Sequence, residues 1–292
     1  MSKSTEQNKL INELVKLISG NALKKYRIEP GKAREIINHT LMKYPGLNKL
    51  LEKYPDVKLL RRTSAFDEIN KNAKKTIYYY LRTYHQGSDE QKALIEKIRK
   101  SHISEKKELA IDLAATHSSV KERKSSLDEF YNKLAPYLDQ AKNIIDVGCG
   151  LHPLTFPFNN FPVERYLALD NNETSTDILK IAKSALEIKE LTVKKWNISE
   201  GWQDVRKKNQ NFDLAFLMKL VPAVLRQDKE LEKILLETPA ETWIISGSKI
   251  SLTKKQSIEK REHKIINKFI EKSEKQKTEE FSIAGEFCII VR

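Results

Sequence analysis

The chain has 292 residues, of which 39% are hydrophobic, so it is long enough to bury the core of an α/β domain and of a smaller second domain. No stretch approaches the roughly 18 consecutive apolar residues of a membrane-spanning helix, and residues 1–9 lack the apolar segment of a signal peptide. The two cysteines form no Cys-x-x-Cys pattern, which disfavours a disulfide framework and a zinc site. We therefore expect a cytoplasmic protein without a metal ion.

The basic charge is distributed unevenly along the chain, whose net charge is +13. Residues 1–140 carry 28 Lys and Arg against 18 Asp and Glu, a net of +10, whereas residues 141–292 carry 25 against 22, a net of +3. This asymmetry is typical of a polyanion-binding region attached to a nearly neutral catalytic unit. A lysine-rich helical domain with no such partner is the alternative interpretation of the charge alone.

The first part of the chain predicts a small bundle of helices. Apolar residues recur at helical spacing over 6–19 and 30–44, and further helices are expected at about 64–84 and 89–100. We take residues 1–110 as this basic helical domain.

The segment 117–123, His-Ser-Ser-Val-Lys-Glu-Arg, predicts the start of another helix. Ser119 and Glu122 have the spacing of a capping box, so we expect the helix to run from there to about Leu138. Arg123 would then project from its second turn.

A short apolar strand enters a glycine-rich turn at residues 143–151, Asn-Ile-Ile-Asp-Val-Gly-Cys-Gly-Leu. Gly148 and Gly150 lack the Cβ that would keep the backbone away from a ligand. Asp170 ends the next apolar run, 20 positions after Gly150, about where a nucleoside-binding sheet places the acceptor for the ribose hydroxyls. These features predict an adenosine-containing ligand, and a purely structural turn is the alternative. Pro153 stands where the dinucleotide fingerprint has its third glycine, which disfavours NAD.

The Asp-x-Gly-x-Gly turn resembles the first motif of the class I S-adenosylmethionine methyltransferases, in which Asp146 would help to hold the methionine end of the cofactor. The strand pattern has the order expected of that fold. Strands are expected near 143–147, 165–169, 191–198, 212–218 and 241–246, and residues 281–291 predict a hairpin around Ala284-Gly285. We therefore expect an α/β, Rossmann-like, seven-stranded sheet with a terminal antiparallel hairpin over residues 111–292, preceded by an all-α N-terminal domain.

Three linked motifs resemble those of one family, the aminoglycoside-resistance 16S rRNA (guanine-N7) methyltransferases of the Arm and FmrO type. They are the His-x-Ser-x-x-Glu-Arg segment 117–123, the Cys-Gly-Leu-His-Pro-Leu turn 149–154 and the Lys-Leu-Val-Pro segment 219–222. The resemblance covers residues 115–292 in the family's order. It implies S-adenosyl-L-methionine as cofactor and methyl transfer to N7 of a decoding-site guanine in the 16S rRNA of the small ribosomal subunit. It also implies that the basic helical domain of residues 1–110 docks on rRNA, because members of the family use their N-terminal helices in this way.

The resemblance also implies roles for the matching residues. Arg123 would pair with the carboxylate of the cofactor. Asn197 stands where the family usually has an aspartate near the adenine amino group, and its amide oxygen can still accept a hydrogen bond from that amine. The full set expected to bind the cofactor is His117, Ser118, Ser119, Arg123, Asp146, Gly148, Gly150, Asp170, Asn197 and Gln227.

Lys219 is the residue expected to be catalytic. It follows the apolar run 212–218, so it lies at the C-terminal edge of a parallel sheet, where such sheets bind ligands. Guanine N7 has an unprotonated lone pair, so the reaction needs positioning and no general base. A lysine near the O6 and N7 edge could orient the flipped base and offset the charge as the methyl group arrives. A lysine that simply extends into solvent from the strand end is the alternative.

The loop after the fifth strand departs from the family pattern. Ile250 stands where the family often has an arginine, and Lys249 lies one position earlier. A lysine cannot reproduce the planar fork of a guanidinium. Lys254 and Lys255 keep the loop basic, as phosphate contacts require, so we expect Lys249, Lys254 and Lys255 to contact the RNA.

These observations favour a monomeric rRNA methyltransferase that makes 7-methylguanosine in the decoding site and confers aminoglycoside resistance. Two alternatives stay open: a methyltransferase of another RNA nucleotide, and a non-catalytic ribosome- or RNA-binding protein on the same fold. The basic N-terminal half disfavours a small-molecule methyltransferase.

Overall fold

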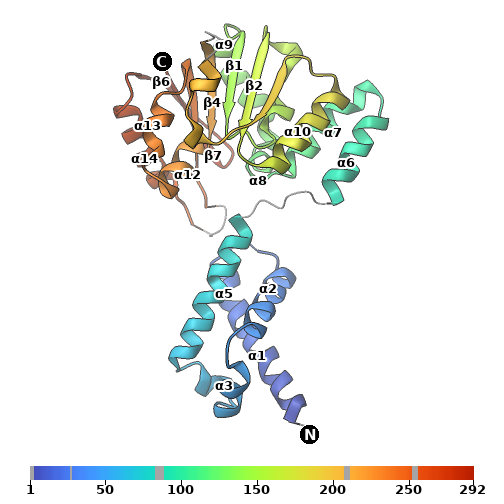
Figure 1. Ribbon diagram of the computed structural model, residues 1–292, viewed down its shortest axis with the longest axis vertical. Helices are drawn as coiled ribbons and strands as arrows, with labels where there is room; N and C mark the ends of the chain where they lie inside the picture. The colour runs from blue at the N-terminus through green and yellow to red at the C-terminus, as the bar shows by residue number, and fades with distance from the viewer. Residues whose placement is uncertain (1–2, 27, 83–88, 207–210, 252–255) are drawn as a thin grey trace. The chain divides into compact units, whose positions relative to one another are not determined.

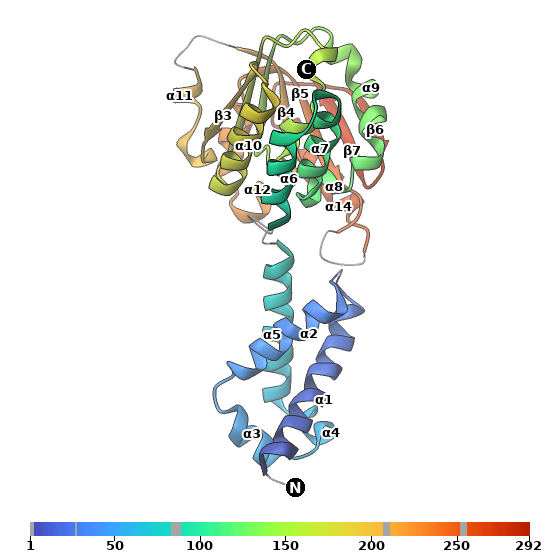
Figure 2. The same cartoon turned by 90° about the vertical axis from the view of Figure 1, so that its right-hand side faces the viewer.

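The computed structural model describes residues 3–26, 28–82, 89–206, 211–251 and 256–292, with side chains described at all of these except 3–6, 79–82, 118 and 227. The chain divides into two compact units, each with its own hydrophobic core. Unit 1 comprises Met1–Tyr84 and Ile250–Gln256, and unit 2 comprises His85–Lys249 and Ser257–Arg292 (Figures 1 and 2). None of the described helices is both long enough and apolar enough to cross a membrane.

Unit 1 is a helical bundle, as its periodicity predicts. Its described helices are α1 (Lys3–Leu23), α2 (Pro30–Met42), α3 (Leu47–Lys53), α4 (Val57–Leu60) and α5 (Ser64–Arg82). The apolar faces of α1, α2 and α5 meet in one core that contains Leu14, Ile37 and Ile69. The helices predicted at 6–19, 30–44 and 64–84 are confirmed, whereas the short α3 and α4 have too few turns for a periodic signal.

Unit 2 is built on a mixed sheet with the strand order β3-β2-β1-β4-β5-β7-β6 (Figure 1). The strands are β1 (Asn143–Val147), β2 (Arg165–Asp170), β3 (Leu191–Lys195), β4 (Phe212–Met218), β5 (Ala240–Ser248), β6 (Lys277–Ile283) and β7 (Glu286–Val291). The first five pair in parallel, and β7 runs antiparallel to both β5 and β6. This is the class I methyltransferase sheet that the sequence predicts, with its terminal hairpin.

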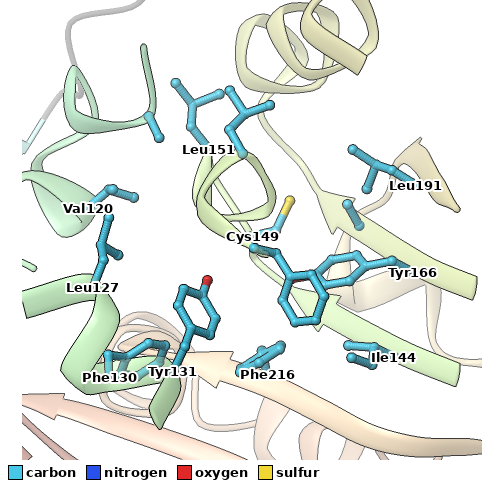
Figure 3. Packing of buried hydrophobic residues seen from close by; sticks show 14 of the residues in the cluster. Val120, Leu127, Phe130, Tyr131, Ile144, Cys149, Leu151, Tyr166, Leu191 and Phe216 are labelled. Carbon is cyan, nitrogen blue, oxygen red and sulfur yellow. The ribbon is translucent and has the colours of Figure 1, made fainter. Parts of the chain in front are cut away.

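Helices cover both faces of this sheet, so its central strands are apolar on both sides. The face that Ile144 points to is covered by α6 (Asp89–Lys100), α7 (Ile103–Ala115), α9 (Leu127–Leu138) and α10 (Glu173–Leu186). Figure 3 shows part of this layer, including Phe130, Tyr166 and Phe216. The face that Ile145 points to is covered by α11 (Gln203–Arg206), α12 (Leu220–Gln227), α13 (Leu231–Leu236) and α14 (Glu259–Glu271).

The helices α6 and α7 belong to unit 2 and not to the N-terminal bundle. Ile98 and Leu113 are fully buried in the same cluster as Ile144, and Lys106 Nζ donates to the carbonyl oxygen of Ala185 in α10 at 2.7 Å. The compact units therefore divide between Tyr84 and His85, well before the boundary at residue 110 expected from the sequence. An amphipathic pattern shows which face of a helix is buried, but it does not show what covers that face.

The continuous helix predicted from Ser119 to Leu138 is wrong. The chain instead forms α8 (Ser118–Lys121), a 3₁₀ turn η1 (Lys124–Ser126) and then α9. Ser119 Oγ lies 2.8 Å from His117 Nδ1. Arg123 sits at the break with 2% of its surface exposed, so its side chain points inward and does not project from a helix surface.

We predict that Ile98→Ala destabilises unit 2, because a buried isoleucine truncated to alanine costs about 2–5 kcal/mol. All three tryptophans, Trp196, Trp202 and Trp243, lie in unit 2, so the denaturant midpoint followed by tryptophan fluorescence reports that unit. The matched control is Ile37→Ala, in the core of unit 1.

We expect Ile98→Ala to lower the fluorescence midpoint clearly more than Ile37→Ala does. An unchanged fluorescence transition in Ile98→Ala would contradict the assignment of α6 to unit 2.

Candidate functional site

The glycine turn after β1 and the acidic end of β2 are directly bonded. Gly150 N–H donates to Asp170 Oδ2 at 2.7 Å, and Asn172 N–H donates to Asp170 Oδ1 at 2.8 Å. Gly148 and Gly150 have φ values of +64° and +52°, a backbone region that residues with a Cβ avoid. Burial raises the pKa of Asp170 despite these two bonds. The two signals that predict an adenosine ligand thus form one structural element.

His117 packs directly on this turn. A Cβ added to Gly150 would lie 3.0 Å from His117 Cε1, so the imidazole would have to shift by a few tenths of an ångström to make room for it. Burial, together with the nearby charge of Lys219, lowers the pKa of His117 to about 4. The imidazole is therefore neutral at physiological pH. Its packing on Gly150 also holds the 117–123 segment against the glycine turn.

Arg123 forms a buried ion pair with Glu286, the first residue of β7. Its Nη2 donates to Glu286 Oε2 at 3.0 Å and its Nε donates to Oε1, while the guanidinium carbon lies 4.5 Å from the ring centroid of Phe130. The side chains of the pair are 2% and 3% exposed. Both partners of this pair are therefore shielded from water and held in one orientation.

The pair remains charged although it is buried. Burial by itself raises the pKa of Glu286, but the charge and the hydrogen bonds of Arg123 outweigh it and hold the pKa below its usual value. Burial by itself lowers the pKa of Arg123, and Glu286 reverses that change. The sequence analysis did not predict Glu286 as a site residue. The feature that could have indicated it is that Glu286 is the single acidic residue in the apolar hairpin run 281–291.

Lys219 lies where β4 ends, as predicted, and its backbone is unusual. Its φ is +56°, a left-handed conformation that is strained for a residue with a Cβ, and its N–H donates to Ser246 Oγ at 3.0 Å. Its Nζ lies 2.7 Å from Glu122 Oε2 and 3.6 Å from Glu286 Oε2, and the side chain is only 17% exposed. The alternative of a lysine extending into solvent is therefore wrong.

Lys219, Arg123, Glu122 and Glu286 make one charge cluster at the carboxyl edge of the sheet. Its two cations and two carboxylates balance, so the cluster needs no further counterion. Two of its members come from the 117–123 segment, one from the end of β4 and one from β7. Residues far apart in the sequence are thus combined in one polar site.

Asp146 lies beneath the turn and is fully buried. Its Oδ2 accepts from Tyr166 OH at 2.8 Å and lies 2.8 Å from His152 Nδ1. Its Oδ1 is buried and has no hydrogen-bond partner among the described residues. Tyr131, labelled with Tyr166 in Figure 3, extends the network, since its hydroxyl lies 3.3 Å from His152 Nε2. The site thus has an unused carboxylate oxygen under the glycine turn.

Other predicted residues lie outside this cluster. Asn197 is exposed after β3, which ends at Lys195 and not at 198, and it caps the 3₁₀ turn η4 (Ile198–Glu200) by accepting from Ser199 N–H at 3.0 Å. Lys249 Nζ lies 3.9 Å from Glu259 Oε1. The side chains of Ser118 in α8 and Gln227 in α12, and the whole of Lys254 and Lys255, lie outside the described residues.

The ribosomal RNA methyltransferase (FmrO) family matches residues 107–280, more than half of the chain. The chain belongs to this family. The match contains the 117–123 segment, the glycine turn and Lys219, but its last residue precedes Glu286.

One relative is similar in sequence, and two solved structures are similar in fold. The chain is 32% identical over 78 residues to a 16S rRNA (guanine(1405)-N(7))-methyltransferase of Micromonospora olivasterospora, a match that covers 26% of this chain and 27% of the relative. The fold is similar to that of the 16S rRNA methyltransferase RmtF in complex with S-adenosyl-L-homocysteine, with a TM-score of 0.61, 18% identity and coverage of 89% of this chain and 97% of that one. The 16S rRNA methylase RmtB has a TM-score of 0.56, 14% identity and coverage of 97% and 98%.

We predict that His117 makes stability depend on pH between about 6.5 and 4. In that range the unfolded chain binds a proton that the folded chain excludes, so the free energy of unfolding falls as the pH falls. Between pH 7 and pH 5 we expect the wild type to lose roughly 2 kcal/mol more than His117→Gln does, measured by urea unfolding.

The control is His102→Gln at an exposed position, which should lose as much stability as the wild type. Equal losses in the wild type and in His117→Gln would show that the imidazole titrates freely in the folded protein.

Proposed function

We propose that this protein is an S-adenosyl-L-methionine-dependent methyltransferase that modifies N7 of a decoding-site guanine in 16S rRNA. The guanine corresponds to position 1405 in the name of the Micromonospora relative. The observation that carries the proposal is the convergence of His117, Arg123 and Lys219 on the glycine turn and carboxyl edge of a class I sheet, in a chain of an rRNA methyltransferase family. Resistance to aminoglycosides would follow from the modification.

The residues present fit this cofactor. Gly148 and Gly150 give the turn positive φ values and let Leu220 and His117 pack closely on it, and Asp170 beside it has carboxylate oxygens able to accept further bonds from ribose hydroxyls. The unpartnered Oδ1 of Asp146 is an acceptor suited to an ammonium group on the methionine end. When bound, the cofactor supplies an electrophilic methyl group on a sulfonium.

Arg123 is oriented to bind the carboxylate of the cofactor. A guanidinium has five N–H donors, and Glu286 takes two of them, one from Nε and one from Nη2. The others can make charge-assisted bonds to a second carboxylate. Glu286 thus positions Arg123 and balances its charge before any ligand binds.

Lys219 would position the guanine. Its ammonium is held at the sheet edge by Glu122 and Glu286. From there it can donate to O6 of an extruded guanine, which leaves the N7 lone pair free and aligns it for in-line attack on the methyl group. No residue has to remove a proton, because N7 is already unprotonated. His117 stays neutral and lines the same side of the turn.

The remaining predicted contacts complete the proposal. Ser118, Ser119, Asn197 and Gln227 would line the cofactor, and Lys249, Lys254 and Lys255 would contact rRNA phosphates. Asn197 already uses its amide oxygen in a cap, so it would have to share that oxygen with the adenine amine. We further propose that the substrate is the small ribosomal subunit and that the protein acts as a cytoplasmic monomer.

The decisive experiment incubates the protein and labelled S-adenosylmethionine with unmodified small subunits, free 16S rRNA and tRNA, and locates the methyl group by mass spectrometry. We expect 7-methylguanosine in the decoding-site fragment. Lys219→Ala should reduce transfer by about 100-fold or more while binding S-adenosylhomocysteine within about threefold of wild type. The control is Lys180→Ala, an exposed lysine on α10 whose Nζ lies 3.2 Å from Asp177.

Full activity of Lys219→Ala would overturn its catalytic assignment. Label on another nucleotide would support a methyltransferase with a different target. Cofactor binding without label on any RNA would favour a non-catalytic RNA-binding protein.

Arg123→Lys should weaken S-adenosylhomocysteine binding by about tenfold or more, measured by calorimetry, because lysine keeps the charge but loses the planar fork. The matched control is Arg165→Lys, since Arg165 begins β2 at the opposite, amino-terminal edge of the sheet. Thermal unfolding of both variants separates loss of binding from loss of fold. An unchanged dissociation constant in folded Arg123→Lys would contradict the proposed contact.

A further inference from the structure

Unit 1 contains a pocket of about 490 Å³ that is separate in sequence from the cofactor site. Its lysines are Lys71, Lys74 and Lys75 on α5 and Lys25, which follows the end of α1. Since all of these residues belong to unit 1, the pocket is described by that unit alone.

The helix α5 has two distinct faces, and one of them forms the pocket. Ile69, Ala73 and Ile77 are buried in the core of unit 1. Positions 67, 70, 71, 74, 75 and 78 share the other face at helical spacing, and all six line the pocket. The lysines are therefore brought together by the helix geometry and by the end of α1.

The electrostatics of this pocket favour an anion. Four lysines face a single carboxylate, that of Asp67, which leaves a net charge of +3. Residues 1–84 carry 18 Lys and Arg against 8 Asp and Glu, a net of +10 out of the chain's total of +13. Like charges at three- and four-residue spacing repel each other, and a bound phosphate would relieve that repulsion.

The pocket also offers groups that a phosphate alone does not need. Asn70 Oδ1 is buried and has no hydrogen-bond partner among the described residues. An amide oxygen accepts from a base amine or a ribose hydroxyl, and the half-buried Tyr78 adds an aromatic wall. Cations, an unused acceptor and an aromatic ring together match a nucleotide better than they match a simple anion.

We propose that this pocket binds one nucleotide unit of folded RNA, with its phosphate on the lysines and its base or ribose at Asn70 and Tyr78. The proposal rests on the proposed function, because it takes the polyanion to be the RNA substrate. A free nucleotide has the same chemistry, so the experiment has to distinguish the two sources. The site adds RNA affinity without taking part in methyl transfer.

The test uses the full-length double variant Lys71→Glu/Lys74→Glu. The control is Lys49→Glu/Lys58→Glu, which makes the same change of charge at exposed positions of α3 and α4 outside the pocket. We expect the pocket variant to bind small subunits or 16S rRNA at least about tenfold more weakly, the control to change by less than about threefold, and S-adenosylhomocysteine binding to stay unchanged in both. Circular dichroism checks that both fold.

Two further measurements identify the ligand. Photo-crosslinking of 4-thiouridine-containing rRNA, followed by mass spectrometry, should place crosslinks on the peptide that contains Asn70 and Tyr78. GMP and ATP at millimolar concentration should not displace the RNA. The proposal would be overturned if the pocket and control variants lost RNA affinity equally, or if no crosslink appeared on this peptide. Saturable binding of GMP or ATP would show that a free nucleotide, and not RNA, is the ligand.

If the double variant does not fold, Lys71→Gln and Asn70→Ala replace it in the same assay, and wild-type RNA affinity in both would overturn the site. RNA binding is measured without cofactor and repeated in Lys219→Ala. A pocket-dependent RNA affinity in a protein that transfers no methyl group would support this site while the proposed activity failed.

Discussion

The ion pair between Arg123 and Glu286 is the interaction on which the candidate site depends. It joins the segment before the sheet to the last strand, across 163 positions of sequence. Removing one partner of such a buried pair leaves an uncompensated charge and costs about 3–5 kcal/mol, so the fold has to keep the two side chains together. Glu286 also lies 3.6 Å from Lys219 Nζ, so one carboxylate holds both cations in place. A ligand that binds these cations meets groups already oriented, which lowers the entropy cost of binding.

The glycine turn is likewise held in place by contacts on two sides. Gly150 donates to Asp170 and lies against the ring of His117, while Asp146 below the turn holds His152 and Tyr166. Each contact removes conformational freedom from a backbone that glycine would otherwise leave loose. These contacts therefore restrict the glycine turn, although its two glycines would by themselves allow many backbone conformations.

Sequence reasoning predicted the sheet well because buried parallel strands appear as continuous apolar runs. β1 and β4 have the expected bounds, 143–147 and 212–218, and the hairpin order is confirmed. The failures concern contacts between distant residues. Nothing in residues 117–138 alone shows that Arg123 turns inward to pair with a residue of the last strand. Arg123 makes this turn at the point where the predicted helix is broken. Likewise, the periodicity of α6 shows an apolar face but not that the sheet covers it.

The charge distribution divides two physical tasks between the two units. In unit 2 the charge cluster is neutral, since the charges of Lys219 and Arg123 are balanced by those of Glu122 and Glu286. Because its charges cancel, such a cluster exerts little long-range attraction on a polyanion. Residues 1–84 instead carry a net charge of +10. Under the proposed function, residues 1–84 would attract the RNA, an interaction that weakens with salt, whereas the cluster in unit 2 would orient the reacting groups at short range, which salt screens much less.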